Sequence, residues 1–76
     1  HKLRQEMIRI IHQEGKITVT DLYERLRLEQ SVASQHLAML RRVGIVTTTR
    51  DGKYIYYSLD HSRLEEINRL TEELVG

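Results

Sequence analysis

Cysteine is absent from the 76 residues, and so are proline and any long apolar run. Without cysteine the chain has no disulfide, no thiol chemistry and no zinc site built on cysteine ligands, which fits a cytoplasmic protein. No run approaches the roughly 18 apolar residues that cross a membrane, and no signal peptide is visible. The lack of proline and of low-complexity sequence argues against linkers. We therefore expect one small cytoplasmic domain over residues 1–76, with no membrane partner.

Charge is nearly balanced over the chain but unevenly distributed along it. The formal net charge is +1, which by itself is a weak indication of a nucleic-acid partner. Residues 30–59 carry four cationic side chains against one carboxylate, whereas residues 60–76 carry two against five. A basic middle and an acidic tail would let one face meet phosphates while another faces solvent or a partner. An ordinary mixed surface has the same composition, so charge alone leaves both interpretations open.

The helical spacing of apolar residues predicts three short helices in the first half of the chain. The first ends at Gly15. The sequence TVTD (residues 18–21) fits a capping box that begins a second helix, which ends near Arg27. After a tight break, a third helix covers about residues 30–43, and Gly44 ends it. The inward face of this third helix is expected to carry Ala33, Leu37 and Leu40.

Two strands and a fourth helix complete the expected order. The segments VTTTR and KYIYYSL flank Asp51-Gly52, a dipeptide typical of a type I′ hairpin turn. A two-residue turn there pairs Arg50 with Lys53, and residues 62–75 predict an amphipathic helix. The expected fold is mostly α with a β-hairpin, in the order helix, helix, helix, hairpin, helix. The core side of the strands is expected to carry Val46, Ile55, Tyr57 and Leu59.

This order describes a winged helix-turn-helix, in which the second helix of the motif enters the major groove of DNA and the hairpin lies against the backbone or minor groove. The outer face of the third helix consists of short, uncharged polar side chains. Gln pairs with adenine through two hydrogen bonds, and Ser bonds to bases or phosphates, while nearby cations suit phosphates. A plain solvated surface is the alternative for each of them. The candidate DNA-binding residues are Gln30, Ser31, Ser34, Gln35, Arg41, Arg42, Arg50 and Lys53.

The other chemistry-bearing residues do not form a catalytic or metal-binding set. His36 is expected to pack beside the inward face of the third helix. His1, His12 and His61 are too scattered along the chain to predict a metal site. The sequence has no glycine-rich phosphate loop, no paired acid groups in an obvious pocket and no Ser-His-Asp arrangement. We expect neither an enzyme nor a protein with a cofactor.

Three segments resemble the ArsR/SmtB family of bacterial winged-helix repressors. LEQSVASQHLAMLRRVGIV (residues 28–46) is similar to the recognition-helix region, whose pattern is Ser-x-x-Ser-x-His-Leu-x-x-Leu, a basic stretch, glycine and two aliphatic residues. RDGKYIYYSLD is similar to the family's wing, and RQEMIRIIHQEG to its second helix. The resemblance covers nearly the whole chain and is most specific from Ser31 to Val46. It implies a dimeric repressor that binds double-stranded DNA at an inverted repeat.

The chain departs from this family at three places. The family's first helix, which helps to form the dimer, has no counterpart, and because the chain begins with His1 we expect a piece of a longer protein. Metal-sensing members have Cys-Val-Cys where this chain has TVT over residues 18–20. Other members bind zinc-like ions between C-terminal helices, where this chain offers only Asp60 and His61 near the start. The resemblance therefore implies no metal ligands here, and the inducing signal stays open.

The last helix is expected to join two copies of the chain. Its apolar face has too few intrachain partners in so small a domain to be hidden fully, and it carries Leu64, Ile67 and Leu74. The alternative function is a winged-helix module that binds another protein and not DNA. An acidic or apolar recognition face would favour that alternative. Because the third helix is polar and the hairpin cationic, DNA binding is the favoured hypothesis.

Overall fold

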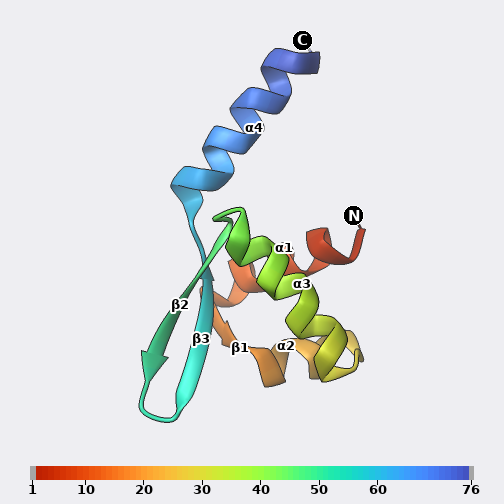
Figure 1. The fold of residues 1–76 in the computed structure, drawn as a ribbon, viewed down its shortest axis with the longest axis vertical. Coiled ribbons are helices and arrows are strands. Elements are labelled where there is room, and N and C mark those ends of the chain that lie inside the picture. Colours follow the sequence, from red (N-terminus) through yellow and green to blue (C-terminus); the bar gives the residue numbers. More distant parts are fainter. Residues whose placement is uncertain (1, 76) are drawn as a thin grey trace.

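Helices surround a small antiparallel sheet, and the last helix leaves this body (Figure 1). The computed structural model describes the backbone of residues 2–75 and the side chains of residues 2–70. The predicted order of helices and hairpin is confirmed, with one strand added between the first two helices. The elements are α1 (Lys2–Glu14), β1 (Lys16–Thr18), α2 (Val19–Leu26), α3 (Gln30–Arg42), β2 (Val46–Asp51), β3 (Tyr54–Leu59) and α4 (His61–Val75).

The helix ends lie where the sequence predicted them, within about a residue. Thr18 Oγ1 accepts a hydrogen bond from the backbone N–H of Asp21 at 3.2 Å, which satisfies one of the first-turn donors of α2. Arg27 adopts the left-handed conformation at φ 54° and ends that helix. After α3, Gly44 has φ 84°, a conformation that costs a residue with a Cβ roughly 1–2 kcal/mol. Glycine there therefore ends α3 without strain.

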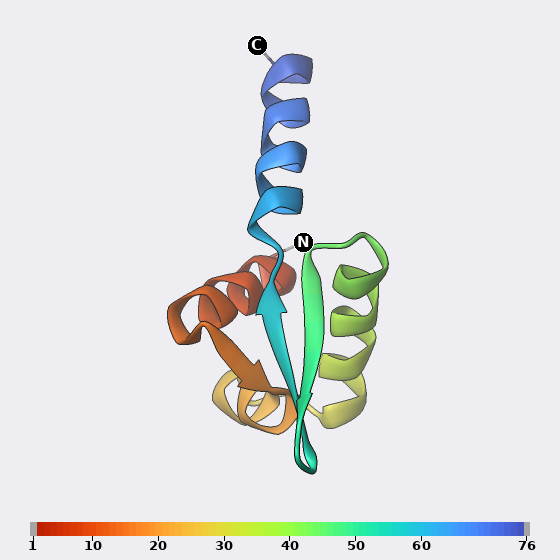
Figure 2. The same ribbon diagram turned by 90° about the vertical axis from the view of Figure 1, so that its left-hand side faces the viewer.

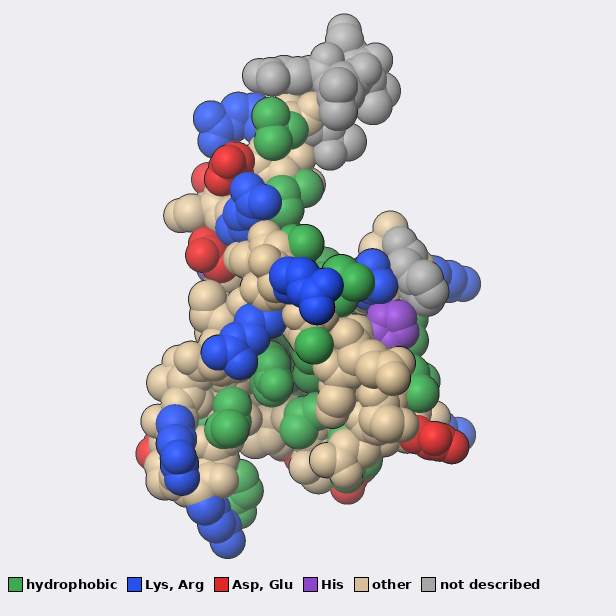
Figure 3. Space-filling view, in the orientation of Figure 1, with side chains coloured by type: hydrophobic (Ala, Val, Ile, Leu, Met, Phe, Trp, Pro, Cys, Tyr) green, Lys and Arg blue, Asp and Glu red, His purple; other side chains and the backbone are tan. Residues whose placement is uncertain are grey.

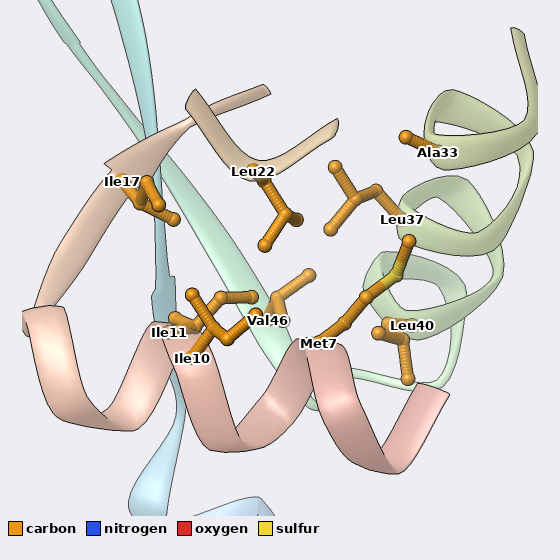
Figure 4. Packing of buried hydrophobic residues seen from close by; sticks show 9 residues of the cluster. All are labelled: Met7, Ile10, Ile11, Ile17, Leu22, Ala33, Leu37, Leu40 and Val46. Atoms are coloured by element: carbon orange, nitrogen blue, oxygen red, sulfur yellow. The ribbon is translucent and has the colours of Figure 1, made fainter. Parts of the chain in front are cut away.

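The described side chains form one apolar core to which both halves of the chain contribute (Figure 4). None of its residues is more than 5% exposed. Leu22 of α2 and Leu37 of α3 point toward one another in it, so the core holds these two helices in a fixed relation. The predicted inward face of α3 is confirmed. The core consists of Met7, Ile10, Ile11, Ile17, Leu22, Ala33, Leu37, Leu40 and Val46.

The sheet has three strands in the order β1-β3-β2, with both pairs antiparallel (Figure 2). β1 was not predicted, because three residues are too few to show an alternating pattern. Ile17, in the middle of β1, is opposite Tyr57 and is 5% exposed. The short strand thus closes the edge of β3 that the hairpin partner leaves free, and ties the start of α2 to the sheet.

The predicted hairpin register is wrong by two residues. Asp51 is opposite Tyr54, so the turn consists of Gly52 and Lys53 and not of Asp51 and Gly52. Gly52 has φ 62° while Lys53 does not have a positive φ, which is the type II′ arrangement with glycine first. Arg50 is therefore opposite Ile55. Because side chains alternate with a period of two, a shift of two residues leaves every side chain on its predicted face.

The hairpin extends beyond the core, and this corrects one predicted core position. Val46 is 1% exposed, and Tyr57 and Leu59 pack against the core as expected. Ile55 lies on the same face but is 52% exposed, because it is opposite Arg50 in the distal half of the hairpin. Figure 1 shows that this half runs past the end of the helices. The distal half is thus a free extension with polar and apolar side chains in solvent.

The fourth helix begins one residue earlier than predicted and points away from the body (Figures 1 and 2). Asp60 Oδ1 accepts a hydrogen bond from the backbone N–H of Arg63 at 3.0 Å, so Asp60 caps this helix. Leu64 and Ile67 are partly exposed, and Leu70 is 51% exposed. The side chain of Leu74 lies outside the described residues. No helix within residues 2–75 has both the length and the apolar character that crossing a bilayer demands.

Candidate nucleic-acid interface

A tight connection joins α2 to α3 and sets the angle between them. The backbone N–H of Leu28 donates to the carbonyl of Tyr23 at 2.9 Å, and that of Arg27 donates to Glu24 at 3.2 Å. These bonds close the C-terminal end of α2 directly before α3 begins. Glu29 is the N-cap residue of α3, but its side chain makes no capping hydrogen bond. The first backbone N–H groups of α3 thus keep the partial positive charge of a helix N-terminus.

The core fixes which face of α3 is presented to solvent. Ala33 and Leu37 are completely buried and Leu40 is 3% exposed, so the opposite side of the helix faces outward. All eight candidate DNA-binding residues of the sequence analysis are exposed. On α3 they are Gln30, Ser31, Ser34, Gln35, Arg41 and Arg42, and on the hairpin they are Arg50 and Lys53.

The imidazole of His36 lies at the edge of this exposed face. His36 is partly buried, and its Nδ1 accepts a hydrogen bond from Arg4 Nε of α1 at 3.3 Å. The packed position predicted for His36 is confirmed. The contact joins α1 to α3 across 32 positions of sequence, so it was not predictable from local patterns.

The distal hairpin combines two cations with exposed apolar surface. Arg50 Nε donates to the carbonyl of Gly52 at 3.2 Å, which holds the guanidinium at the turn. Lys53 Nζ lies 5.3 Å from the centre of the Tyr54 ring, a cation–π contact. Tyr54 is 51% exposed, and its ring centre is 6.4 Å from that of Tyr56. Although the two cations are not opposite one another, both are at the tip of the hairpin.

None of the described ion pairs involves a candidate DNA-binding residue. They join Arg9 to Glu6 at 2.7 Å, Arg25 to Glu14 at 2.7 Å, and Arg63 to Glu66 at 3.4 Å. The hydrogen bond and the charge of Arg9 lower the pKa of Glu6 from its usual value. Within residues 2–70, no carboxylate pairs with the cations of α3 or of the hairpin.

The face shared by α3 and the hairpin has an uneven distribution of charge. In Figure 3, blue cationic side chains lie at the hairpin tip and beside the C-terminal end of α3, whereas mostly uncharged side chains cover the rest of that helix. Cations on the hairpin and at one end of a neutral polar helix match a duplex, because phosphates flank each groove and base edges line its floor.

A second feature of the structure is an open groove between α1 and α4, which no sequence pattern predicted. The rings of His12 and His61 meet edge to face there, with centres 5.7 Å apart. The groove has a volume of about 420 Å³, and apolar side chains such as Ile8 and Leu64 line much of it. Within residues 2–70, no three His, Cys, Asp or Glu side chains converge as a metal site would require. His12 is exposed on α1.

Comparison with known proteins places this geometry in a family. A family model described as a helix-turn-helix domain matches residues 1–49. The transcriptional activator HlyU of Vibrio cholerae is 36% identical over 61 residues, which are 80% of this chain and 56% of HlyU. The transcriptional repressor PagR of Bacillus anthracis is 31% identical over 70 residues, which are 92% of this chain and 70% of PagR. The chain spans about half the length of the first curated relatives it matches.

Solved structures agree over nearly the whole fold. A crystal structure described as a possible transcriptional regulator for arsenical resistance has a TM-score of 0.87 at 30% identity, covering 97% of this chain and 76% of that one. These relatives are named as transcriptional regulators and not as enzymes. The helix-turn-helix match, the resemblance along the recognition-helix segment and the shared fold lead to one conclusion: this chain belongs to the ArsR/SmtB family of winged helix-turn-helix transcriptional regulators.

Proposed function

We propose that this chain is the DNA-binding part of a dimeric repressor that recognises an inverted-repeat operator. In this proposal, α3 lies in the major groove and the hairpin lies on the neighbouring backbone. The observation that carries the proposal is the exposed face of α3. The opposite face of this helix is buried in the core, and its outer face presents the exposed side chains of Gln30, Ser31, Ser34 and Gln35. A rigid helix that presents short hydrogen-bonding side chains is what base recognition requires.

The cations around this face would supply the sequence-independent part of the affinity. Arg41 and Arg42 are exposed at the C-terminal end of α3, and Arg50 and Lys53 at the hairpin tip. Since no described carboxylate pairs with them, they can meet phosphates without first breaking an ion pair. The uncapped N-terminal end of α3 is a further favourable place for a phosphate.

The second copy is proposed to pack on α4. This helix projects from the body, and Leu64, Ile67 and Leu70 leave apolar surface along it that the described residues do not fully cover. A second copy related by a two-fold axis would bury the same surface on both chains and present two α3 helices to one operator. Leu74, the third residue predicted for this interface, lies outside the described side chains.

The proposal is tested by titrating purified protein into labelled duplex DNA over a range of salt concentrations. We expect binding at low salt that weakens linearly on a log–log plot, since cations of the protein displace counterions from phosphates. No binding even at low salt would support the alternative function, a winged-helix module that binds a protein.

Transcription of a template that carries the preferred site then tests repression. We expect the protein to lower transcription, and activation would contradict the proposed repressor.

A further inference from the structure

The C-terminal end of α3 is held by a side chain of α4. Arg63 Nε donates a hydrogen bond to the backbone carbonyl of Val43 at 2.8 Å. The last carbonyls of a helix have no partner within the helix and carry a partial negative charge. A guanidinium is therefore well suited to this end of α3, and the bond is charge-assisted. Val43 is the C-cap residue of the helix that carries the candidate base contacts.

The stem of the same arginine packs on the next residue of the chain. A Cβ added to Gly44 would lie 3.4 Å from Arg63 Cγ and 3.7 Å from Arg63 Cδ. The methylene groups of the arginine thus cover the glycine that ends α3, and the guanidinium reaches past it to Val43. This double contact fixes both the direction of the carbonyl and the position of the linker between α3 and β2.

Backbone bonds hold the start of α4 against the same linker. The backbone N–H of Asp60 donates to the carbonyl of Ile45 at 2.8 Å. The carboxylate of Asp60 caps α4 through the N–H of Arg63 at 3.0 Å, and Arg63 Nη1 lies 3.4 Å from Glu66 Oε1. Two bonds between the chain segments, one from Asp60 and one from Arg63, therefore set the direction of α4 relative to the end of α3.

We propose that Arg63 is a positioning residue that fixes α3 relative to α4, so that the orientation of α4 determines how well α3 fits the major groove. This inference rests on the proposed role of α3 in base recognition. Leu64 and Ile67, which are proposed to meet the second copy, lie within about one helical turn of Arg63. Any rotation of α4 at that contact moves the anchor of α3. Arg63 itself does not bind phosphate in this proposal.

The test compares Arg63→Met, which keeps the packing of the stem but removes the donor, with Arg63→Lys, which keeps a cationic donor. Arg69→Met is the matched control, because Arg69 is an exposed arginine on the same helix. Affinity is measured for a duplex that the unmodified chain enriches from a random pool, and for a scrambled duplex, at several salt concentrations. A thermal unfolding curve of each variant shows that it is folded.

We expect Arg63→Met to bind the enriched duplex about tenfold more weakly, as the loss of one charge-assisted hydrogen bond predicts, with unchanged affinity for the scrambled duplex. Arg63→Lys should restore most of the loss, and Arg69→Met should cause none. The salt slope should be the same for all variants. A slope lower by about 1, together with equal losses on both duplexes, would identify Arg63 as a phosphate contact and overturn the proposal.

A measurement without DNA separates this inference from the proposed function. The backbone N–H groups of Val43, Gly44 and Ile45 donate to carbonyls in the last turns of α3. In Arg63→Met these amides should exchange with solvent about tenfold faster than in Arg69→Met, because the anchored end becomes free to open locally. Equal exchange rates would refute the anchor, even if DNA binding is confirmed. Faster exchange in a chain that binds no DNA would refute only the proposed function.

Discussion

Ser34 and Gln35 show that candidate DNA contacts on α3 are direct sequence neighbours of core residues. They lie between Ala33 and Leu37, which are completely buried, yet both are exposed. Helical periodicity alone assigns each side chain to its face. The exposure of the six candidate residues on α3 was therefore predictable from the sequence. A role for any of these residues in DNA binding is a prediction that requires measurement.

Replacing Ser34 or Gln35 with Ala should reduce discrimination between the preferred and a scrambled duplex by about 1–3 kcal/mol, if the side chain bonds to a base edge. Affinity for the scrambled duplex should change little, because base edges there already fail to match. Gln13→Ala is the control, since Gln13 is an exposed glutamine on α1, away from α3. Equal losses on both duplexes would assign these residues to the backbone.

The two hairpin cations should behave in the opposite way. Arg50→Ala or Lys53→Ala should weaken binding to all duplexes alike, and each lost phosphate contact should lower the salt slope by about 1. Phosphates repeat on every sequence, so no discrimination should be lost. Arg25→Ala is a suitable control, because Arg25 pairs with Glu14 at 2.7 Å outside the proposed interface. A purely sequence-specific loss would place the hairpin on bases.

We expect this chain to bind no metal ion at residues 18–20 or at the start of α4, the two places that correspond to the metal sites of metal-sensing family members. The hydroxyl of Thr18 caps α2, and threonine offers no thiolate to a soft metal ion. His12 and His61 give two imidazoles, whereas structural zinc takes about four ligands. Titration with Zn²⁺ in competition with a chelator should show no stoichiometric site. Binding at micromolar or tighter affinity would contradict this expectation, and His12→Ala would then locate the ligand.

Among the elements, the helices were predictable and the sheet was only partly so. The helices repeat their apolar residues over two or more turns, and Gly15, Thr18 and Gly44 mark three of their ends, so the predicted bounds agree within about a residue. In the hairpin, Gly52 is compatible with a turn of Asp51 and Gly52 and with one of Gly52 and Lys53. The sequence predicted the first, and the structure has the second. β1 pairs with β3, which is far along the chain; the most distant pair is Lys16 and Ser58. No local sequence pattern indicates this pairing.

The glycine that ends α3 provides a test at this scale. Gly44→Ala should lower the free energy of unfolding by about 1–2 kcal/mol, because alanine is strained at φ 84°, while its Cβ would lie in ordinary contact with Arg63 Cγ at 3.4 Å. Gly15→Ala is the matched control, since Gly15 has φ 79° but nothing within 4 Å of an added Cβ. Chemical denaturation of both variants measures the two costs. The two losses should be similar, and a negligible loss for both variants would contradict the left-handed conformation of these glycines.

For the whole molecule, the contacts that decide the arrangement of the parts join residues far apart in sequence. The bond from Arg63 to Val43 spans 20 positions, and that from Arg4 to His36 spans 32. No pattern in the sequence indicates them, because they depend on how the helices pack and not on local periodicity. The sequence therefore predicted the surface proposed to meet DNA but not the junction between α3 and α4.

The projecting α4 predicts a dimer. Sedimentation of the chain at tens of micromolar should give twice the mass of one copy, and Leu70→Glu should convert it to a monomer. Leu70 is 51% exposed within one copy, so the substitution should leave the fold intact while it places a charge in the proposed interface. Gln13→Glu adds the same charge on α1 and should leave the dimer unchanged. A monomeric unmodified chain would contradict the proposed interface on α4.

Selection from a pool of random-sequence duplexes tests the central claim most directly, because every possible operator competes in one experiment. We predict that the chain enriches one motif with two-fold symmetry, whose half-sites are about 10 bp apart or a multiple of this distance, as two α3 helices on one side of the duplex require. Ser34→Ala or Gln35→Ala should relax the preference at one position in each half-site. A pool that stays random after repeated rounds, although the protein binds it at low salt, would contradict base recognition by α3.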